Sequence, residues 1–342
     1  MEMLLKDHSH KRFNILTREW VLVSPNRTDR PWQGQKENNS GSPQESYDPD
    51  CYLCPGNKRI HGVVNPNYTS TFVFENDFAA LKQKGPGFEL NEGLLKAKSE
   101  SGVCKVICFS PDHSKSLSNM TIEAISEVIS AWQSEYIELG RFPDINYVQI
   151  FENKGSVMGC SNPHPHGQIW AQSSIPDEVQ KKNISQKEYF EKKRSGLLED
   201  YLSQEFKSDE RIVYKNKDFV VLVPFWAIWP FEAMIAPLNR SAHIGLMTKG
   251  EKLSFAKAIK VLTLCYDRIF NYPFPYSAGI HQAPTDGKDH KEWHWHMSFY
   301  PPLLRSSKIK KFMVGFEMFA MPQRDFTAEF AAGRLRELIN SG

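Results

Sequence analysis

Two histidines and a glutamine occupy every second position of the run Asn162-Pro163-His164-Pro165-His166-Gly167-Gln168. Alternate side chains of a strand project to one face, so this spacing predicts a strand that points His164, His166 and Gln168 into one site. The two prolines disfavour a helix and fit an edge strand or an irregular entry to a strand. Upstream, the small, polar, glycine-punctuated loop at 153–161 offers backbone N–H groups to an anion. An imidazole beside such a loop indicates chemistry on a phosphoryl group.

His166 is the predicted nucleophile of that chemistry. An imidazole that attacks phosphorus gives a phosphoramidate, which lasts long enough to be intercepted by a second substrate. Histidine suits this role because its neutral form predominates near pH 7. A His-x-His pair taken alone is equally typical of two structural histidines with satisfied hydrogen bonds. The prediction therefore needs support from the rest of the chain.

Cys51 and Cys54 form a Cys-x-x-Cys pair followed by Pro-Gly, which is typical of half a zinc site. The chain has no second such pair, so the other ligands must be distant in the sequence. Six cysteines in 342 residues favour reduced thiols and a metal over a disulfide framework. This composition predicts a cytoplasmic protein.

Composition excludes several classes of protein. The chain is long enough for one large domain or two, and its 40% hydrophobic and 24% charged residues are ordinary for a globular protein. A net charge of +2, from 42 basic and 40 acidic residues, indicates neither a nucleic-acid nor a membrane partner. We identify no signal peptide, and no apolar run approaches the roughly 20 residues of a membrane span.

Two segments repeat one pattern of elements, which predicts an internal duplication. In the first, a strand at 105–109, a helix at 121–139 and a strand at 147–151 precede the histidine pair. In the second, a strand at 233–236, a helix opened by a Thr248–Glu251 capping box and a strand at 276–281 precede His294 and His296. The second pair has bulky aromatic neighbours and no glycine loop. We therefore expect one active site, with the second half forming a wall for the substrate.

Three segments follow from this pattern: an N-terminal half at 1–176, a charged linker at 177–217 and a C-terminal half at 218–342. Residues 1–50 are polar and turn-rich, which predicts a long surface arm. The linker is expected to be helical over 186–202.

The active-site run closely resembles that of the galactose-1-phosphate uridylyltransferases, a branch of the histidine-triad nucleotidyl transferases. The resemblance covers nearly the whole chain and is carried in order by the runs Arg27–Gly34, Cys51–Cys54, Phe74–Phe78, His281–Pro284, Lys311–Glu317 and Gln323–Arg324. It implies an α/β (α+β) fold, a mostly antiparallel sheet built from two duplicated histidine-triad-like halves with helices packed on one side. It also implies a homodimer.

The same resemblance implies an activity. UMP would pass from UDP-glucose to galactose 1-phosphate by double displacement through a uridylyl group on His166, giving UDP-galactose and glucose 1-phosphate. Gln168 would bind phosphoryl oxygens where hydrolytic relatives have a further histidine, which favours a transferase. A related enzyme, such as an ADP-sugar or dinucleoside polyphosphate phosphorylase, shares this nucleophile and remains an alternative. A zinc-stabilised module that binds a nucleotide or nucleic acid and has lost catalysis is a second alternative.

Further site residues are implied by the resemblance. They comprise phosphate contacts at Arg27, Arg30, Asn153, Gly159, Cys160 and Ser161, nucleoside contacts at Asn76 and Asp77, and hexose and phosphate contacts at Lys311, Phe312, Val314, Phe316, Glu317 and Gln323. On residue type alone, Asn76-Asp77 is equally typical of a turn, and the lysines of 308–324 of a solvated surface.

Two metal sites are implied as well. The resemblance adds His113 and His164 to the two cysteines as zinc ligands, whereas on residue type alone His113 suits a solvated turn. Well-known bacterial relatives hold iron at a second site, to which His281 and His296 correspond. The remaining two positions are Lys182 and Ser298, and a protonated lysine has no lone pair for a metal. We therefore predict that the iron site is degraded.

Overall fold

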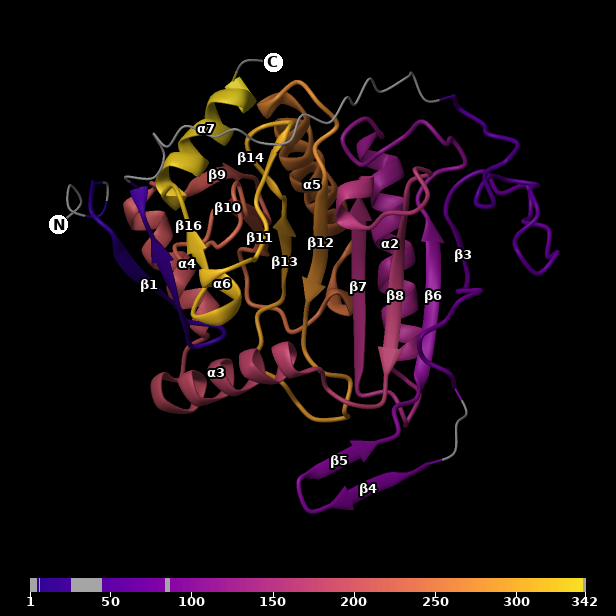
Figure 1. Ribbon diagram of the computed structural model, residues 1–342, viewed down its shortest axis with the longest axis horizontal. Coiled ribbons are helices and arrows are strands. Elements are labelled where there is room, and N and C mark those ends of the chain that lie inside the picture. The colour runs from indigo at the N-terminus through magenta and orange to yellow at the C-terminus, as the bar shows by residue number, and fades with distance from the viewer. Residues whose placement is uncertain (1–4, 6, 26–44, 84–86, 341–342) are drawn as a thin grey trace.

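The computed structural model describes residues 5, 7–25, 45–83 and 87–340. A nine-stranded sheet crosses the molecule, and each neighbouring pair of its strands is antiparallel (Figure 1). In spatial order the strands are β3 (Phe72–Glu75), β6 (Gly102–Cys108), β8 (His166–Gln172), β7 (Tyr147–Lys154), β12 (Tyr276–His281), β13 (His296–Tyr300), β11 (Ala233–Pro237), β10 (Phe219–Leu222) and β9 (Ile212–Lys215). The predicted mixed fold with a mostly antiparallel sheet is confirmed.

The sheet consists of two similar halves. The first half contributes the order β6-β8-β7 and the second half the order β11-β13-β12. The halves meet where β7 pairs with β12, with Phe151 opposite Gly279. The repeated pattern of strand, helix, strand and histidine pair is thus present as expected, and both histidine pairs lie at the start of a central strand of one continuous sheet.

The two long helices cover one face of this sheet. Helix α2 (Ile122–Leu139) begins at Thr121, whose side chain accepts a hydrogen bond from the Ala124 N–H. Helix α5 (Lys249–Ile269) begins with the predicted capping box between Thr248 and Glu251. Their apolar faces, together with α7 (Ala328–Asn340), pack on the sheet in one large hydrophobic core.

The expectation that helices pack on one side only is incomplete. Helix α4 (Leu197–Ser208) packs its buried leucines and Tyr201 against Val220, Leu222 and Met234, which alternate with the residues that face α5. The predicted helix over 186–202 is wrong in its bounds, since α3 (Asp177–Lys193) ends before α4 begins. Arg194, directly after α3, has φ 59°, and Gly196 directly precedes α4.

The prediction of a surface arm over residues 1–50 is wrong for residues 10–23, and its part at 26–44 lies outside the described residues. Strands β1 (His10–Asn14) and β2 (Glu19–Val23) form a small sheet with β16 (Gln323–Arg324). Arg12 is buried there and forms an ion pair with Glu329 of α7 at 2.8 Å. The prediction failed because charged residues alternate with apolar ones in β1 and β2, so that the segment is polar on average although one face of it is buried.

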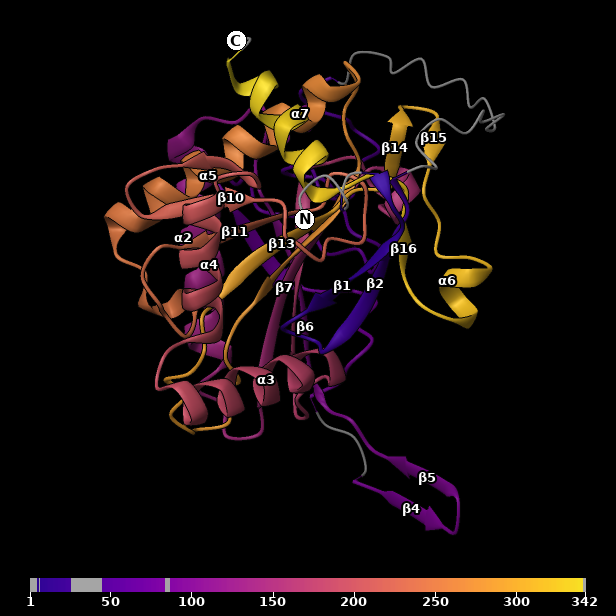
Figure 2. The same ribbon diagram turned by 90° about the vertical axis from the view of Figure 1, so that its left-hand side faces the viewer.

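Smaller elements complete the fold. A hairpin of β4 (Glu89–Glu92) and β5 (Leu95–Lys98) projects from the body (Figure 2). Strands β14 (Leu303–Ser306) and β15 (Ile309–Lys310) form another hairpin, followed by the short helix α6 (Phe316–Phe319). Two 3₁₀ turns that lie wholly within the described residues are η2 (Ser156–Met158) and η3 (Ile244–Leu246). Among the described residues, no helix has the length and apolar character needed to cross a bilayer.

Candidate active site

Strand β8 begins at His166, and its alternation sets the orientation of the predicted site residues. His166 and Gln168 line a cavity of about 480 Å³, whereas Ile169 packs in the core beneath the helices. Gly167 between them has no room for a side chain. A Cβ there would lie 2.9 Å from the Phe151 carbonyl oxygen and 2.9 Å from the Phe109 ring. The glycine therefore lets β8 lie close against its neighbours.

The His166 ring has a defined protonation pattern. Its Nδ1 lies 2.7 Å from the backbone carbonyl oxygen of His164. A carbonyl only accepts, so Nδ1 carries the proton and Nε2 keeps its lone pair. Burial lowers the pKa of this imidazole, which keeps the ring neutral near pH 7. The ring is thus prepared for attack through Nε2.

Gln168 is also fixed by a neighbour. The Trp170 indole N–H donates to Gln168 Oε1 at 3.0 Å. Because the amide oxygen is engaged, the amide nitrogen retains its donors for a ligand. An NH₂ group two residues from an imidazole can bind the oxygens of the group that the imidazole attacks.

The cavity gathers several residues predicted from the sequence and others that were missed. Ser161, Asn76 and Asp77 line it together with His166 and Gln168. The missed lining residues are Tyr52, Leu53, Lys58, Arg59, Ile60, Phe74, Phe78 and Val106. For two of these residues the sequence offered a signal. Lys58 and Arg59 directly follow the Cys-x-x-Cys-Pro-Gly-Asn run, so two cations were to be expected close to the metal cluster.

Arg59 is held over the ring of Phe74, with its guanidinium carbon 4.0 Å from the ring centroid. It also forms an ion pair with Asp77 at 3.6 Å. Two of its nitrogens, Nε and Nη1, are buried without a hydrogen bond in the described part of the chain. A guanidinium in this state suits an incoming phosphate, which accepts such bonds bidentately.

Other predicted contacts are not among the lining residues of this cavity. Asn153 accepts a hydrogen bond from the Ser277 hydroxyl at 2.6 Å, and the Cys160 thiol donates to the Asn162 carbonyl at 3.0 Å. Gly159 has φ 79° in the loop that leads to Ser161. Arg27 and Arg30 lie outside the described residues.

The C-terminal set of predicted contacts lies elsewhere in the same chain. Figure 1 places α6 and β16 at one end of the molecule and β3, β6 and β8 at the other. Lys311 contacts the Glu317 carboxylate and the Gln323 carbonyl there. Phe312, Val314 and Phe316 are exposed. The described part of one chain therefore does not bring this set to His166.

The predicted zinc ligands form one compact cluster. Cys51, Cys54, His113 and His164 are all buried, and their ligand atoms lie within 4.8 Å of one another. The alternative of a solvated turn for His113 is excluded, since that side chain is 3% exposed. The cluster can hold a metal ion.

The geometry of the cluster fits a tetrahedral ion. Cys54 Sγ lies 3.5 Å from Nδ1 of both His113 and His164, and these two nitrogens are 3.3 Å apart. With Zn–S at about 2.3 Å and Zn–N at about 2.05 Å, a tetrahedron places S and N about 3.5 Å apart and two nitrogens about 3.3 Å apart. Without an ion, burial raises the pKa of the Cys54 thiol to about 11, whereas a divalent cation favours the thiolate.

The tautomer of His164 agrees with metal binding. Its Nε2 donates to the Ser110 carbonyl oxygen at 2.8 Å, which leaves Nδ1 with a lone pair facing the cysteines. On the other side of the cluster, the Asn162 amide donates to Cys51 Sγ at 3.4 Å. These contacts fix the entry to β8 just before His166.

The histidines of the second half, His281 and His296, lie around a lysine amine rather than around cysteines. Lys182 Nζ lies 2.9 Å from His281 Nδ1, and the ring centroids of His281 and His296 are 5.0 Å apart. Burial lowers the pKa of the Lys182 amine to about 7. An amine thus lies against His281 Nδ1, an atom that a metal would need as a ligand, and Ser298, two residues after His296 on β13, is buried. These residues do not fit an iron site.

His296 is the counterpart of His166 in the second half, but it is inaccessible. It is fully buried, and its Nε2 has no hydrogen-bond partner in the described part of the chain. Its Nδ1 lies 3.4 Å from the His294 carbonyl oxygen, a longer contact than in the first half. A buried ring of this kind has no path to a substrate.

Solved structures share this arrangement of strands and helices. One described as "Structure of uridylyltransferase" superposes with a TM-score of 0.77 at 24% identity, covering 97% of this chain and 98% of the other. An ADP-glucose phosphorylase from Arabidopsis thaliana with bound ADP-glucose superposes with a TM-score of 0.75, also at 24% identity, covering 96% and 99%. The fold is therefore the uridylyltransferase fold.

Sequence comparison is more specific. Residues 1–176 match the family "Galactose-1-phosphate uridyl transferase, N-terminal domain", and residues 182–341 match its C-terminal domain. A galactose-1-phosphate uridylyltransferase from Haemophilus influenzae is 49% identical over 333 residues, covering 97% of this chain and 95% of the relative. One from Schizosaccharomyces pombe is 46% identical, with 97% and 95% covered. The chain belongs to the galactose-1-phosphate uridylyltransferase family.

Proposed function

We propose that this protein is a galactose-1-phosphate uridylyltransferase that moves UMP from UDP-glucose to galactose 1-phosphate. The observation that carries the proposal is His166, which lines the cavity and whose Nδ1 proton is committed to the His164 carbonyl at 2.7 Å, so that Nε2 keeps its lone pair. Relatives with this name are 41–49% identical to the chain over nearly its full length, which supports the same donor and acceptor.

The reaction proceeds in two displacements at phosphorus. His166 Nε2 attacks the α-phosphorus of UDP-glucose, an N–P bond forms, and the P–O bond to glucose 1-phosphate breaks. A phosphate oxygen of galactose 1-phosphate then attacks the same phosphorus, and the N–P bond breaks to give UDP-galactose. Nδ1 keeps its proton throughout, so the positive charge of the substituted ring is stabilised by the His164 carbonyl.

The residues around His166 have matching roles in this proposal. The Gln168 amide binds the non-bridging oxygens of the transferred phosphoryl group, and the Ser161 hydroxyl binds the sugar phosphate that leaves or enters. Arg59 and Lys58 compensate the charge of the diphosphate, while Asn76 and Asp77 contact the nucleoside. Much of the rate enhancement then comes from positioning and from donors aimed at the phosphoryl oxygens.

We further propose that the Cys51, Cys54, His113 and His164 cluster binds zinc. Two thiolates and two imidazoles at tetrahedral spacing suit this ion. When bound, zinc supplies a structural cross-link that holds His164, and through its carbonyl the ring of His166, in place. Because all four positions are filled by protein ligands, no open position remains for a substrate. The six cysteines are all free thiols, which fits a cytoplasmic protein.

A homodimer is the oligomer that we propose. The apolar segment around Phe312, Val314 and Phe316 is exposed and lies far from the cavity of its own chain. In a symmetric dimer this segment can reach the cavity of the partner and bring Lys311, Glu317 and Gln323 to the hexose phosphate.

Intact-protein mass spectrometry tests the proposed activity. The chain is mixed with UDP-glucose alone, with ADP-glucose alone, and in each case as the wild type and as His166→Gly. We expect a uridylyl adduct in the wild type that disappears on adding galactose 1-phosphate and is absent from the variant. An adenylyl adduct would keep the mechanism and change the substrate, whereas no adduct with metal-loaded protein would remove covalent catalysis.

A further inference from the structure

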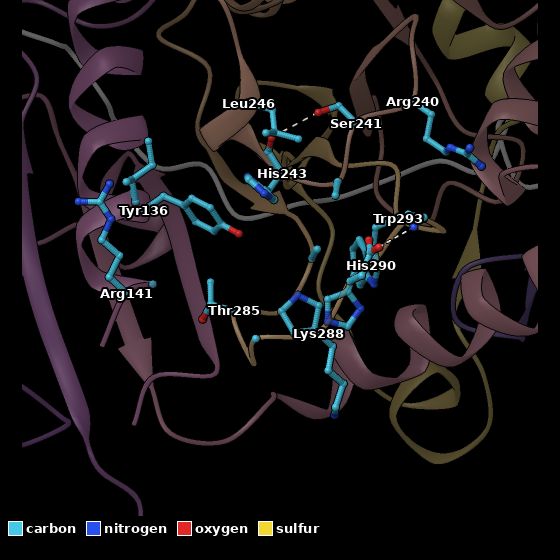
Figure 3. A pocket seen from close by; sticks show the side chains of 18 of the residues that line it. Tyr136, Arg141, Arg240, Ser241, His243, Leu246, Thr285, Lys288, His290 and Trp293 are labelled. Carbon is cyan, nitrogen blue, oxygen red and sulfur yellow. Dashed lines mark hydrogen bonds and ion pairs between the residues drawn. The ribbon is translucent and has the colours of Figure 1, made fainter. Parts of the chain in front are cut away.

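A larger cavity, of about 730 Å³, shares no lining residue with the cavity at His166. Its walls come from the C-terminal end of α2, the loop before η3, the connection between β12 and β13, and Phe190 near the end of α3 (Figure 3). The volume lies within the range of about 300–1,000 Å³ that is usual for small-molecule sites. The function proposed above uses none of these residues.

Two polar groups in this cavity have no partner in the described part of the chain. The buried Nδ1 of His243 makes no hydrogen bond, and neither His243 Nε2 nor the Tyr136 hydroxyl has one. The two rings lie beside each other, with centroids 5.0 Å apart and planes inclined by 30° (Figure 3). Polar groups with unused hydrogen-bonding capacity that converge on a cavity are typical of ligand sites.

The wall that carries His243 is rigid. The Gln133 amide of α2 donates to the carbonyl oxygens of Ile244 at 3.1 Å and Met247 at 2.8 Å, which fixes the turn after His243. Gln282 is fully buried and accepts from the Ile244 N–H at 3.3 Å. The unused polar groups are therefore held in place by well-bonded neighbours, as a preformed site requires.

The cavity is positively charged. Its lining contains four cations, Arg141, Arg240, Lys288 and Lys291, and one carboxylate, Asp289. Lys288 pairs with Asp286 at 2.9 Å and Lys291 with Asp289 at 2.7 Å. Counting the partner carboxylates Asp286 and Glu199 as well, the balance is four cations against three carboxylates.

Of the four cations, Arg141 forms no ion pair with a described residue, and Arg240 forms only a long one. The Arg141 side chain has no partner in the described ranges. Arg240 lies over the Phe190 ring at 5.0 Å and 3.6 Å from Glu199, with Nη1 buried and without a hydrogen bond. Guanidinium groups that are only partly satisfied attract phosphate and carboxylate groups. Apolar lining from Leu246, Pro284 and Trp293 favours a flat ring in the same ligand.

We propose that this cavity binds a small organic anion, in which a flat ring carries a phosphate or carboxylate group. The ring packs against Tyr136, His243 and the apolar lining, and the anionic group faces Arg141, which lies on the same side of the cavity as Tyr136 (Figure 3). The Tyr136 hydroxyl donates a hydrogen bond to the ligand. The site is separate from the uridylyl-transfer cavity, so its occupancy does not depend on His166.

The first experiment measures binding of 8-anilinonaphthalene-1-sulfonate, a ringed anion, by its fluorescence with the full chain at low salt. Leu246→Asp places a negative charge in the lining, and Arg141→Ser removes a positive one, both at exposed positions. We expect the affinity to fall by about three- to tenfold in each variant. Leu253→Asp and Lys257→Ser, which change exposed residues of α5 outside the lining, should bind like the wild type.

The second experiment separates the two parts of the ligand by displacement of the bound probe. Phenyl phosphate or benzoate should displace it at concentrations well below those needed for phenol or inorganic phosphate, and the better of the two acids identifies the anionic group. His166→Gly should bind the probe as the wild type does. Equal binding by all cavity variants, or displacement by phenol as good as by phenyl phosphate, would overturn the proposal.

Discussion

His164 and His294 make the same hydrogen bond in the two halves of the chain. Each donates its Nε2 proton to a backbone carbonyl oxygen at 2.8 Å, that of Ser110 for His164 and that of Pro237 for His294. Their Nδ1 atoms differ. In His164 this atom joins the Cys₂His₂ cluster, whereas in His294 it is buried without a partner in the described part of the chain. The second half has thus kept the backbone geometry of the site without its metal ligands.

Gln168 gives a direct test of the phosphoryl contact. Gln168→Glu keeps the size of the side chain but replaces the amide donors with a negative charge, so we expect kcat to fall by roughly 10²- to 10³-fold. Trp170→Phe removes the indole N–H that holds the amide oxygen at 3.0 Å, together with part of the ring, but leaves the Gln168 amide donors in place, so we expect a smaller loss, of about tenfold or less. Single-turnover rates of uridylyl transfer to His166 measure both effects. Equal activity of Gln168→Glu and wild type would rule out this contact.

Metal removal should destabilise the whole N-terminal half. Cys54→Ser is expected to lose the bound ion and about 3 kcal/mol of folding free energy, which corresponds to a fall in Tm of roughly 6–12 °C. Cys265→Ser is the matched control, because Cys265 is a buried free thiol on α5 outside the cluster. Plasma mass spectrometry should give one zinc per wild-type chain. Two metals per chain would mean that the histidines around Lys182 bind one after all.

Lys182 makes the stability depend on pH in a predictable direction. Burial lowers the pKa of its amine from 10.5 to about 7, so between these values the unfolded chain binds a proton that the folded chain does not. Stability therefore rises with pH over this interval, by up to about 4 kcal/mol between pH 7 and pH 10. Urea denaturation of the wild type and Lys182→Met at both pH values isolates this contribution.

The comparison has a defined control. Lys257→Met changes an exposed lysine of α5, and its stability relative to the wild type should be the same at both pH values. For Lys182→Met, the advantage over the wild type should shrink as the pH rises. A constant difference would show that the Lys182 amine is not titrating in the folded protein.

Mixed dimers test whether the C-terminal segment serves the partner. His166→Gly and Glu317→Ala are each expected to be inactive or nearly so when expressed alone. In a heterodimer, one site combines the intact His166 of one chain with the intact Glu317 of the other, so activity should return to roughly a quarter of the wild-type level when the chains mix at random. The same mixture of His166→Gly with Gln168→Glu places both changes at one cavity and should stay inactive. Recovery in that control would contradict the assignment.

The sequence predicts the central sheet well because its signals are local. The amphipathic face of α2 and the capping box of α5 set the helix bounds, and the alternation predicts that His166 and Gln168 share a cavity. His164, which was expected to point into the same site, lies before β8 and belongs to the metal cluster instead. Those patterns depend on neighbours within a few residues. Tertiary packing reinforced them rather than overriding them.

The elements that were missed depend on distant contacts. The residues next to Arg59 in the sequence do not predict its contacts with Phe74 and Asp77, which belong to another segment. Likewise, β1 is linked to α7 by the ion pair between Arg12 and Glu329, and these residues are 317 positions apart in the sequence. The break between α3 and α4 was missed because the charged residues on both sides suit one continuous helix.

The pairing of β7 with β12 has a consequence for how such a duplicated protein avoids self-association. Two separate sheets would present four unpaired edge strands, each able to recruit a strand from another chain. Joining the copies through Tyr147–Lys154 and Tyr276–His281 leaves only β3 and β9 at the ends of the nine-stranded order. The pairing of β7 with β12 therefore removes two of the four edge strands that two separate sheets would have. Separating the two halves would expose β7 and β12 as edge strands again.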